Sequence, residues 1–156
     1  MALRRLRLEY TEYLNNISPY YSLEPSDDFY TWKVLLFGPL ETIYEGGIFD
    51  CSLIFTHEYP YKPPEFIFNT KLLHPNIYSN GKMCISILHE GEDISSYEHI
   101  SERWNPSQSV NSILLSVLSI LIEPNLNSPA NIDINNLYKN NYNEYKNLIY
   151  HLIAKQ

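Results

Sequence analysis

Residues 30–55 read YTWKVLLFGPLETIYEGGIFDCSLIF, which has the alternation of two β-strands joined by a turn. The first strand puts one wholly apolar set and one mixed set of side chains on opposite faces, namely Tyr30, Trp32, Val34 and Leu36 against Thr31, Lys33, Leu35 and Phe37. An apolar face backed by a mixed face is typical of an antiparallel sheet with one solvated side. In the second strand, Cys51 falls on the apolar face, which predicts a small buried hydrophobe.

Helical periodicity flanks this strand region on both sides. Apolar residues within 3–17 recur at steps of three and four and predict an N-terminal helix with one buried face. Residues 110–122 are apolar around the whole axis and predict a central buried helix. Residues 134–152 keep helical spacing, but their asparagines favour short or broken helices. Together these segments predict an α+β fold.

Length, charge and cysteine content narrow the function. The 156 residues suit one domain, and 11 basic against 18 acidic residues give a formal net charge of −7. We expect no nucleic-acid partner, because affinity for phosphates comes from cations. No run approaches the ~20 apolar residues of a membrane helix, so no direct membrane insertion is expected. Two cysteines are too few for a secreted disulfide framework, which favours a cytoplasmic location.

The irregular stretch 72–104 holds the best candidate for chemistry. A segment this long without periodicity is usually functional in a compact domain. Cys84 lies within it and is expected on an accessible loop. A thiol is partly ionised near neutral pH and makes a good nucleophile. From spacing alone, a packed cysteine in front of Ile85 and Ile87 stays open as the alternative.

Neither a cofactor nor a metal ion is expected. The chain has no phosphate-cradling glycine loop with its lysine and no dinucleotide glycine fingerprint. Metal binding would have to use one thiolate among scattered histidines: Cys84 with His74, His89 and His99. Their spacing matches no zinc pattern.

Motifs along essentially the whole chain resemble those of the ubiquitin-conjugating enzymes. The most specific is the tripeptide His74-Pro75-Asn76 with Cys84 ten residues after His74. The other matching segments are residues 1–6, Gly38-Pro39, residues 44–49, residues 59–64, Trp104 with Pro106, and Glu123-Pro124-Asn125. The resemblance implies a single catalytic domain over residues 1–156. It also implies the family's fold, with an N-terminal helix, a four-stranded antiparallel meander, a central buried helix and C-terminal helices.

The resemblance also implies a mechanism. Cys84 would take the C-terminal glycine of ubiquitin from the ubiquitin-activating enzyme as a thioester and pass it to a lysine amine. Asn76 matches the residue that stabilises the oxyanion in the family, with support of the nearby loop as its alternative role. His74 is expected to be a hydrogen-bonded scaffold residue rather than a base.

Within the family, the segment after the cysteine is similar to that of the G subfamily, with an acidic insertion over residues 90–102. Glu92 and Asp93 are candidates to orient the attacking lysine and accept its proton, and a merely solvated loop is the alternative. His89 is a candidate to hold the insertion in place. The insertion is slightly shorter than usual and lacks its customary proline, and Ser128 stands where many relatives have an aspartate beside the active site.

Two partner surfaces follow from the resemblance. The positions that contact RING-type ligases in relatives correspond to Arg4, Arg5, Tyr61, Pro106 and Ser107. We expect the two arginines in solvent and Tyr61 to be the aromatic anchor. The mixed strand face of Thr31, Lys33, Leu35 and Phe37 corresponds to the surface that a helical segment of a membrane-anchored adaptor covers in the G subfamily. An ordinary solvated sheet face is the alternative.

The G subfamily further implies ubiquitin chains that direct proteins to the proteasome, and a peripheral location at the endoplasmic reticulum in the degradation of its proteins. Two other classes of function stay open. One is a catalytically weak relative that acts as a binding module of the ubiquitin pathway, since fold does not imply function. The other is a cysteine hydrolase that pairs Cys84 with a histidine.

Overall fold

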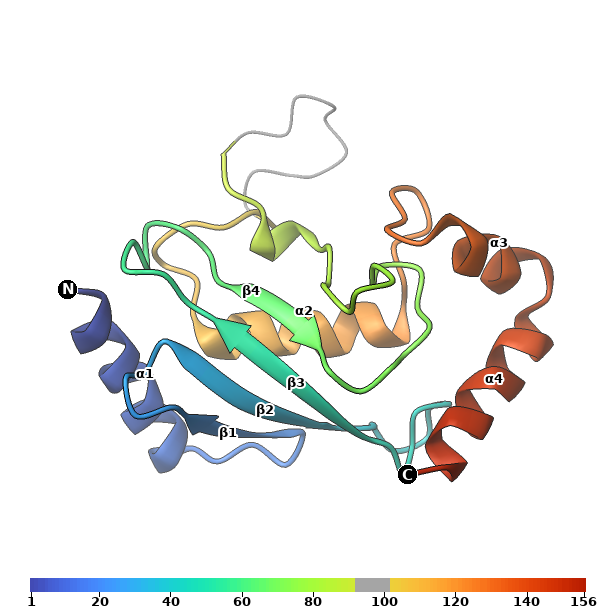
Figure 1. The fold of residues 1–156 in the computed structure, drawn as a ribbon, viewed down its shortest axis with the longest axis horizontal. Helices are drawn as coiled ribbons and strands as arrows, with labels where there is room; N and C mark the ends of the chain where they lie inside the picture. The colour runs from blue at the N-terminus through green and yellow to red at the C-terminus, as the bar shows by residue number, and fades with distance from the viewer. Residues whose placement is uncertain (92–101) are drawn as a thin grey trace.

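The computed structural model describes residues 1–91 and 102–156 of the chain. Its centre is a four-stranded antiparallel sheet in the order β1 Tyr21–Pro25, β2 Thr31–Phe37, β3 Ile48–Ile54 and β4 Glu65–Phe68. The helices are α1 Ala2–Asn15, α2 Val110–Ile122, α3 Ile132–Asn140 and α4 Tyr142–Ala154, and a short 3₁₀-helix, η1, covers Ser86–Leu88. Figure 1 shows α1 beside β1 at one end of the sheet, with α3 and α4 at the other end. The predicted α+β fold and meander are confirmed.

The sheet has the face alternation that the sequence predicts. In β2, Trp32, Val34 and Leu36 are buried, while Thr31 and Lys33 are exposed. Cys51 of β3 pairs with Val34 across the sheet and is fully buried, as expected for a small core residue. The apolar face of the sheet and the buried side of α2 form one hydrophobic core.

Of the apolar positions predicted to share the buried face of α1, Leu3, Leu6, Tyr10 and Tyr13 are buried or half-buried, whereas Leu14 and Ile17 are not. The most buried positions are Ala2, Leu6 and Glu9, and Tyr13 continues this face as a half-buried residue. Leu14 lies one residue further round the helix, about 100° away from Tyr13, and is exposed. Ile17 is exposed because the helix has already ended at Asn15.

Helix α2 begins with a capping box, in which Ser109 and Ser112 satisfy each other's backbone N–H groups. Although it is apolar around its axis, it is buried on one side only. Leu115 and Ile122 are exposed, which corrects the expectation of a wholly buried helix. At the C-terminal end, Asn141 ends α3 and caps α4 by accepting from the backbone N–H of Glu144 at 3.2 Å. This asparagine breaks the predicted C-terminal helices in two.

The segment after β4 folds back beside that strand. Gly81 adopts a left-handed φ of +93°, and a Cβ there would lie 2.2 Å from the Phe68 carbonyl oxygen, so the turn requires glycine. Phe68 N donates to the Gly81 carbonyl at 2.8 Å, and Met83 N donates to the Phe66 carbonyl at 2.9 Å. These bonds place Cys84 directly beyond the edge of the sheet.

Candidate active site

Cys84 lies on this irregular segment and is half-buried. Its backbone N–H donates to the Asn76 carbonyl oxygen at 2.9 Å, which ties it to the His74-Pro75-Asn76 turn. Met83, the residue before it, is buried against the core. Successive side chains of an extended segment point in opposite directions, so the inward Met83 turns Cys84 outward.

The Cys84 sulfur has polar neighbours and a path to solvent. Its Sγ lies 3.4 Å from Nε2 of His89. The Tyr78 phenol is a further neighbour, and its interaction with the Cys84 side chain raises the pKa of the phenol. The three side chains line an open hollow of about 300 Å³, whose walls include Pro63, Pro64 and Leu88. A thiol in this position can be reached by a large acyl donor.

His74 is fully buried and holds the turn in front of the site. Its Nε2 lies 3.1 Å and 3.2 Å from the Ile120 and Leu121 carbonyl oxygens at the end of α2, and its Nδ1 accepts from Asn76 N at 3.0 Å. Burial lowers the pKa of the imidazole to about 4. The ring is therefore neutral near pH 7 and donates from Nε2, which is the geometry of a scaffold residue.

Asn76 uses its side-chain amide on the loop after α2. Its Nδ2 donates to the Asn125 carbonyl at 2.9 Å, and its Oδ1 accepts from Asn125 N at 2.9 Å. The neighbouring Pro75 carbonyl accepts from Ala130 N at 2.8 Å. These contacts show that Asn76 supports the loop after α2. Its role in stabilising the oxyanion stays a prediction. Ser128 is exposed on the same loop, between these two tethers.

Two of the predicted acidic residues, Glu92 and Asp93, lie outside the described residues. Hydrogen bonds join the described residues on the two sides of this insertion, 89–91 and 103–104. Trp104 N donates to the His89 carbonyl at 2.8 Å, and the Arg103 side chain donates to the carbonyls of Glu90 and Gly91 at 2.8 Å and 2.7 Å. The His89 ring therefore contacts Cys84, and the His89 carbonyl oxygen binds Trp104 at the far end of the insertion.

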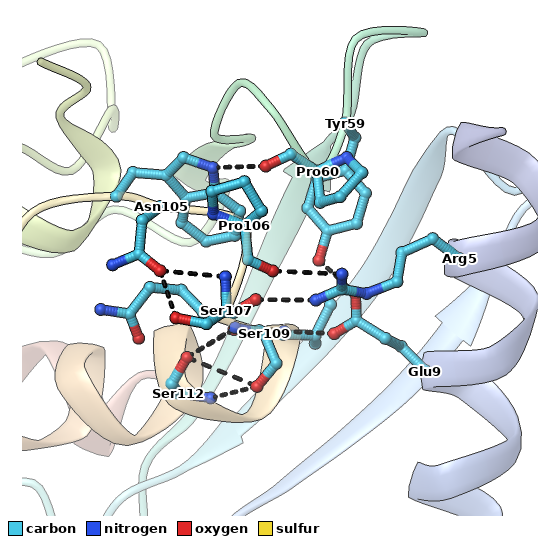
Figure 2. A network of polar contacts seen from close by, with 12 residues as sticks. Arg5, Glu9, Tyr59, Pro60, Asn105, Pro106, Ser107, Ser109 and Ser112 are labelled. Carbon is cyan, nitrogen blue, oxygen red and sulfur yellow. Dashed lines mark hydrogen bonds and ion pairs between the residues drawn. The ribbon is translucent and has the colours of Figure 1, made fainter.

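Four of the five residues predicted to bind a ligase are exposed to solvent: Arg4, Tyr61, Pro106 and Ser107. Arg5 differs, because the expectation of a solvent-exposed side chain is wrong. Its guanidinium donates to the Pro106 and Gln108 carbonyls at 3.1 Å and 2.9 Å and pairs with Glu9 at 3.1 Å (Figure 2). Arg5 thus fixes the loop that carries Pro106 and Ser107 against α1.

Glu9 is the centre of this network, and the sequence reasoning missed it. The buried carboxylate accepts from Val110 N at 2.7 Å, from the Tyr59 phenol and from Arg5 (Figure 2). Glu9 joins α1 to the first residue of α2, where the positive end of the helix favours an anion. The available signal was the Arg5–Glu9 spacing of four residues, which pairs the two side chains on a helix.

The predicted adaptor surface lies on the sheet face that points away from the core. Thr31 and Lys33 are exposed there, and Leu35 and Phe37 are half-buried. Within the described part of the chain, no helix has the length and apolarity to cross a membrane. Among residues 1–91 and 102–156, no three His, Cys, Asp or Glu side chains lie together in a way that could hold a metal ion.

Comparison with known proteins agrees with this arrangement. Residues 5–152 match the ubiquitin-conjugating enzyme family. The chain is 46% identical to the ubiquitin-conjugating enzyme E2-18 kDa of Schizosaccharomyces pombe, over 99% of this chain and 95% of that protein. It is 48% identical to the probable ubiquitin-conjugating enzyme E2 7 of Caenorhabditis elegans, over 80% and 76% of the two chains. It is 40% identical to the human ubiquitin-conjugating enzyme E2 G2, over 99% and 95%.

The chain therefore belongs to the ubiquitin-conjugating enzyme family, and it is a transferase of the kind that carries ubiquitin as a thioester. Members of this family work with ubiquitin, the ubiquitin-activating enzyme and ubiquitin ligases.

Proposed function

We propose that residues 1–156 form one catalytic domain in which Cys84 carries the ubiquitin. The observation that supports this assignment is the setting of its sulfur, which faces an open hollow beside His89 and Tyr78. Hydrogen bonds to a thiolate favour the charged form that acts as the nucleophile. Cys51 lacks such a setting, because it is fully buried in the sheet.

The reaction proceeds by two acyl transfers. The Cys84 thiolate attacks the thioester of the activating enzyme, whose own cysteine leaves as a thiolate. A lysine amine then attacks the carbonyl carbon, an isopeptide bond forms, and the carbon–sulfur bond to Cys84 breaks. Asn76 stabilises the oxyanion of the second step, and Glu92 or Asp93 orients the lysine and accepts its proton. His74 and Ser128 support the site from the turn and the loop that surround it.

A RING-type ligase docks on the surface formed by Arg4, Tyr61, Pro106 and Ser107. Tyr61 is 68% exposed and supplies the apolar anchor that interfaces of this kind use. Arg4 steers the encounter through its charge. Arg5 acts from behind the surface, because its hydrogen bonds to the Pro106 and Gln108 carbonyls hold the loop in place.

The chain belongs to the G subfamily and builds the lysine-linked chains that signal degradation by the proteasome or at the endoplasmic reticulum. Two observations support this assignment: the 40% identity to the human relative named E2 G2, and the long stretch of sequence between His89 and Trp104. A membrane-anchored adaptor helix covers the face of Leu35 and Phe37, whose half-buried apolar side chains suit a partner helix. A Leu35→Glu, Phe37→Glu double variant should load ubiquitin normally and yet lose membrane association in cell fractionation. Retention of the variant on membranes would argue against the adaptor.

The central test is a gel of the protein incubated with activating enzyme, ATP and ubiquitin. We expect an adduct that persists without reducing agent and disappears with dithiothreitol, since a thioester is cleaved by thiols. A binding module would give no adduct, and a cysteine hydrolase would release ubiquitin as the free acid instead of passing it to lysine.

A further inference from the structure

Lys82 and Cys84 emerge from the same side of one extended segment. Met83 lies between them and is buried, so its two neighbours point away from the core. Two isolated bridges, Ile67 with Lys82 and Ile77 with Met83, hold the segment in this conformation. Residues two apart in an extended chain are roughly 6–7 Å from each other, which is within the length of a lysine side chain.

The Lys82 side chain is also close to the candidate site in space. It lines the same hollow as Cys84, and it is 46% exposed. Its only restraint among the described ion pairs is Glu65 on β4, at 3.5 Å. An exposed pair of this kind holds a lysine weakly, because solvent screens both charges.

We propose that Lys82 is a site of self-modification, which accepts ubiquitin from Cys84 of the same molecule when no other acceptor amine is present. This inference rests on the proposed role of Cys84 as the ubiquitin carrier. A second lysine, Lys62, lines the hollow too, but it belongs to the connection before β4 and pairs with Glu58 at 3.3 Å. The shared segment with Cys84 is what favours Lys82 over Lys62.

The step transfers the ubiquitin acyl group from the Cys84 sulfur to the Lys82 nitrogen. The Lys82 ammonium leaves Glu65 and loses one proton to solvent. The free amine attacks the carbonyl carbon of the thioester, a carbon–nitrogen bond forms, and the carbon–sulfur bond breaks. The departing sulfur takes the second amine proton, so the products are an isopeptide at Lys82 and the free Cys84 thiol.

The experiment is a single-turnover chase of the loaded protein without substrate or ligase. Two readouts are taken: the adduct that dithiothreitol removes and the adduct that resists it. In wild type, the adduct that dithiothreitol removes should decrease while the adduct that resists dithiothreitol increases. Peptide mass spectrometry identifies the modified lysine. Lys82→Arg should load normally and lose at least 90% of the resistant adduct, whereas the matched variant Lys62→Arg should retain it. Modification mainly at Lys62, or an undiminished adduct in Lys82→Arg, overturns the proposal.

Two further arms separate the possible causes. A tagged Cys84→Ala protein added to the chase should stay unmodified, and its modification at Lys82 would overturn transfer within one molecule. Glu65→Gln should speed formation of the resistant adduct by up to about fivefold, because the ion pair no longer holds the amine. A slower rate in this variant would count against the proposal. Absence of any removable adduct in wild type would instead refute the role of Cys84, so the two failures are distinguishable.

Discussion

The sheet and the irregular segment after it each carry one cysteine, but different forces hold the two regions. Cys51 sits in β3, where strand pairing and apolar packing bury it completely. Cys84 sits in an irregular segment that a few backbone hydrogen bonds, to Phe66 and Asn76, hold beside the sheet, and the turn it contacts is anchored by the polar side chains of His74 and Asn76. The first arrangement excludes water from the sulfur, and the second leaves it open. A cysteine is made reactive by its supporting structure, and that structure is polar here.

The two cysteines give the largest expected contrast. Burial raises the pKa of the Cys51 thiol far above its usual range, so this sulfur does not ionise near pH 7. Cys84→Ala should abolish ubiquitin loading, and Cys84→Ser should trap a more stable oxyester. Cys51→Ala should load fully and cost only about 1 kcal/mol of unfolding free energy.

The measurements are a non-reducing gel for loading and urea denaturation for stability. Loading that survives in Cys84→Ala would end the assignment of the carrier. A complete loss of loading in a folded Cys51→Ala protein would contradict the assignment of Cys51 as a core residue with no part in the reaction.

Asn76 gives the second largest effect. If its amide stabilises the oxyanion, Asn76→Ala should load ubiquitin normally and discharge it to lysine on the order of 10²–10³ times more slowly. Its two hydrogen bonds to Asn125 predict a loss of stability as well. Discharge and loading rates are therefore compared at a temperature where circular dichroism shows the variant folded. Equal losses in both steps would mean that Asn76 serves only as support for the loop.

The sequence predicted the sheet region well and the polar connections poorly. Alternation in residues 30–55 was enough to place Cys51 inside, because a strand has a fixed two-residue period. Arg5 was misplaced because its acceptors, the Pro106 and Gln108 carbonyls, are 101 and 103 residues away in the chain. No local pattern encodes such a contact. The position of the His89 ring beside Cys84 likewise depends on the path of the chain through η1 rather than on spacing.

His74 makes the polar support sensitive to acid. Its pKa is about 4 in the folded protein, against an ordinary value of 6.5. Between these values the unfolded chain binds more protons than the folded one, so stability falls as the pH drops below about 6.5. The full contribution is present above that pH, and the difference between the two values corresponds to roughly 3 kcal/mol.

Urea denaturation across this pH range measures the effect. A His74→Gln variant lacks the titrating group, so its stability should vary less between neutral and acidic pH than that of wild type. Parallel stability curves for the two proteins would show that the titration of His74 does not contribute.

Tyr78 gives the smallest effect and the finest test of the contrast between the cysteines. Its phenol lines the hollow beside the Cys84 side chain, and an O–H donor near a thiolate favours the ionised form. Tyr78→Phe keeps the ring and removes the hydroxyl group. One hydrogen bond at this half-open site is worth about 1 kcal/mol, so alkylation of Cys84 by iodoacetamide at fixed pH should slow roughly fivefold. Tyr61→Phe is the matched control, since this exposed tyrosine lies outside the hollow. Cys51 should stay unreactive in all three folded proteins, and an unchanged alkylation rate in Tyr78→Phe would show that the Tyr78 hydroxyl group does not affect the reactivity of the thiol.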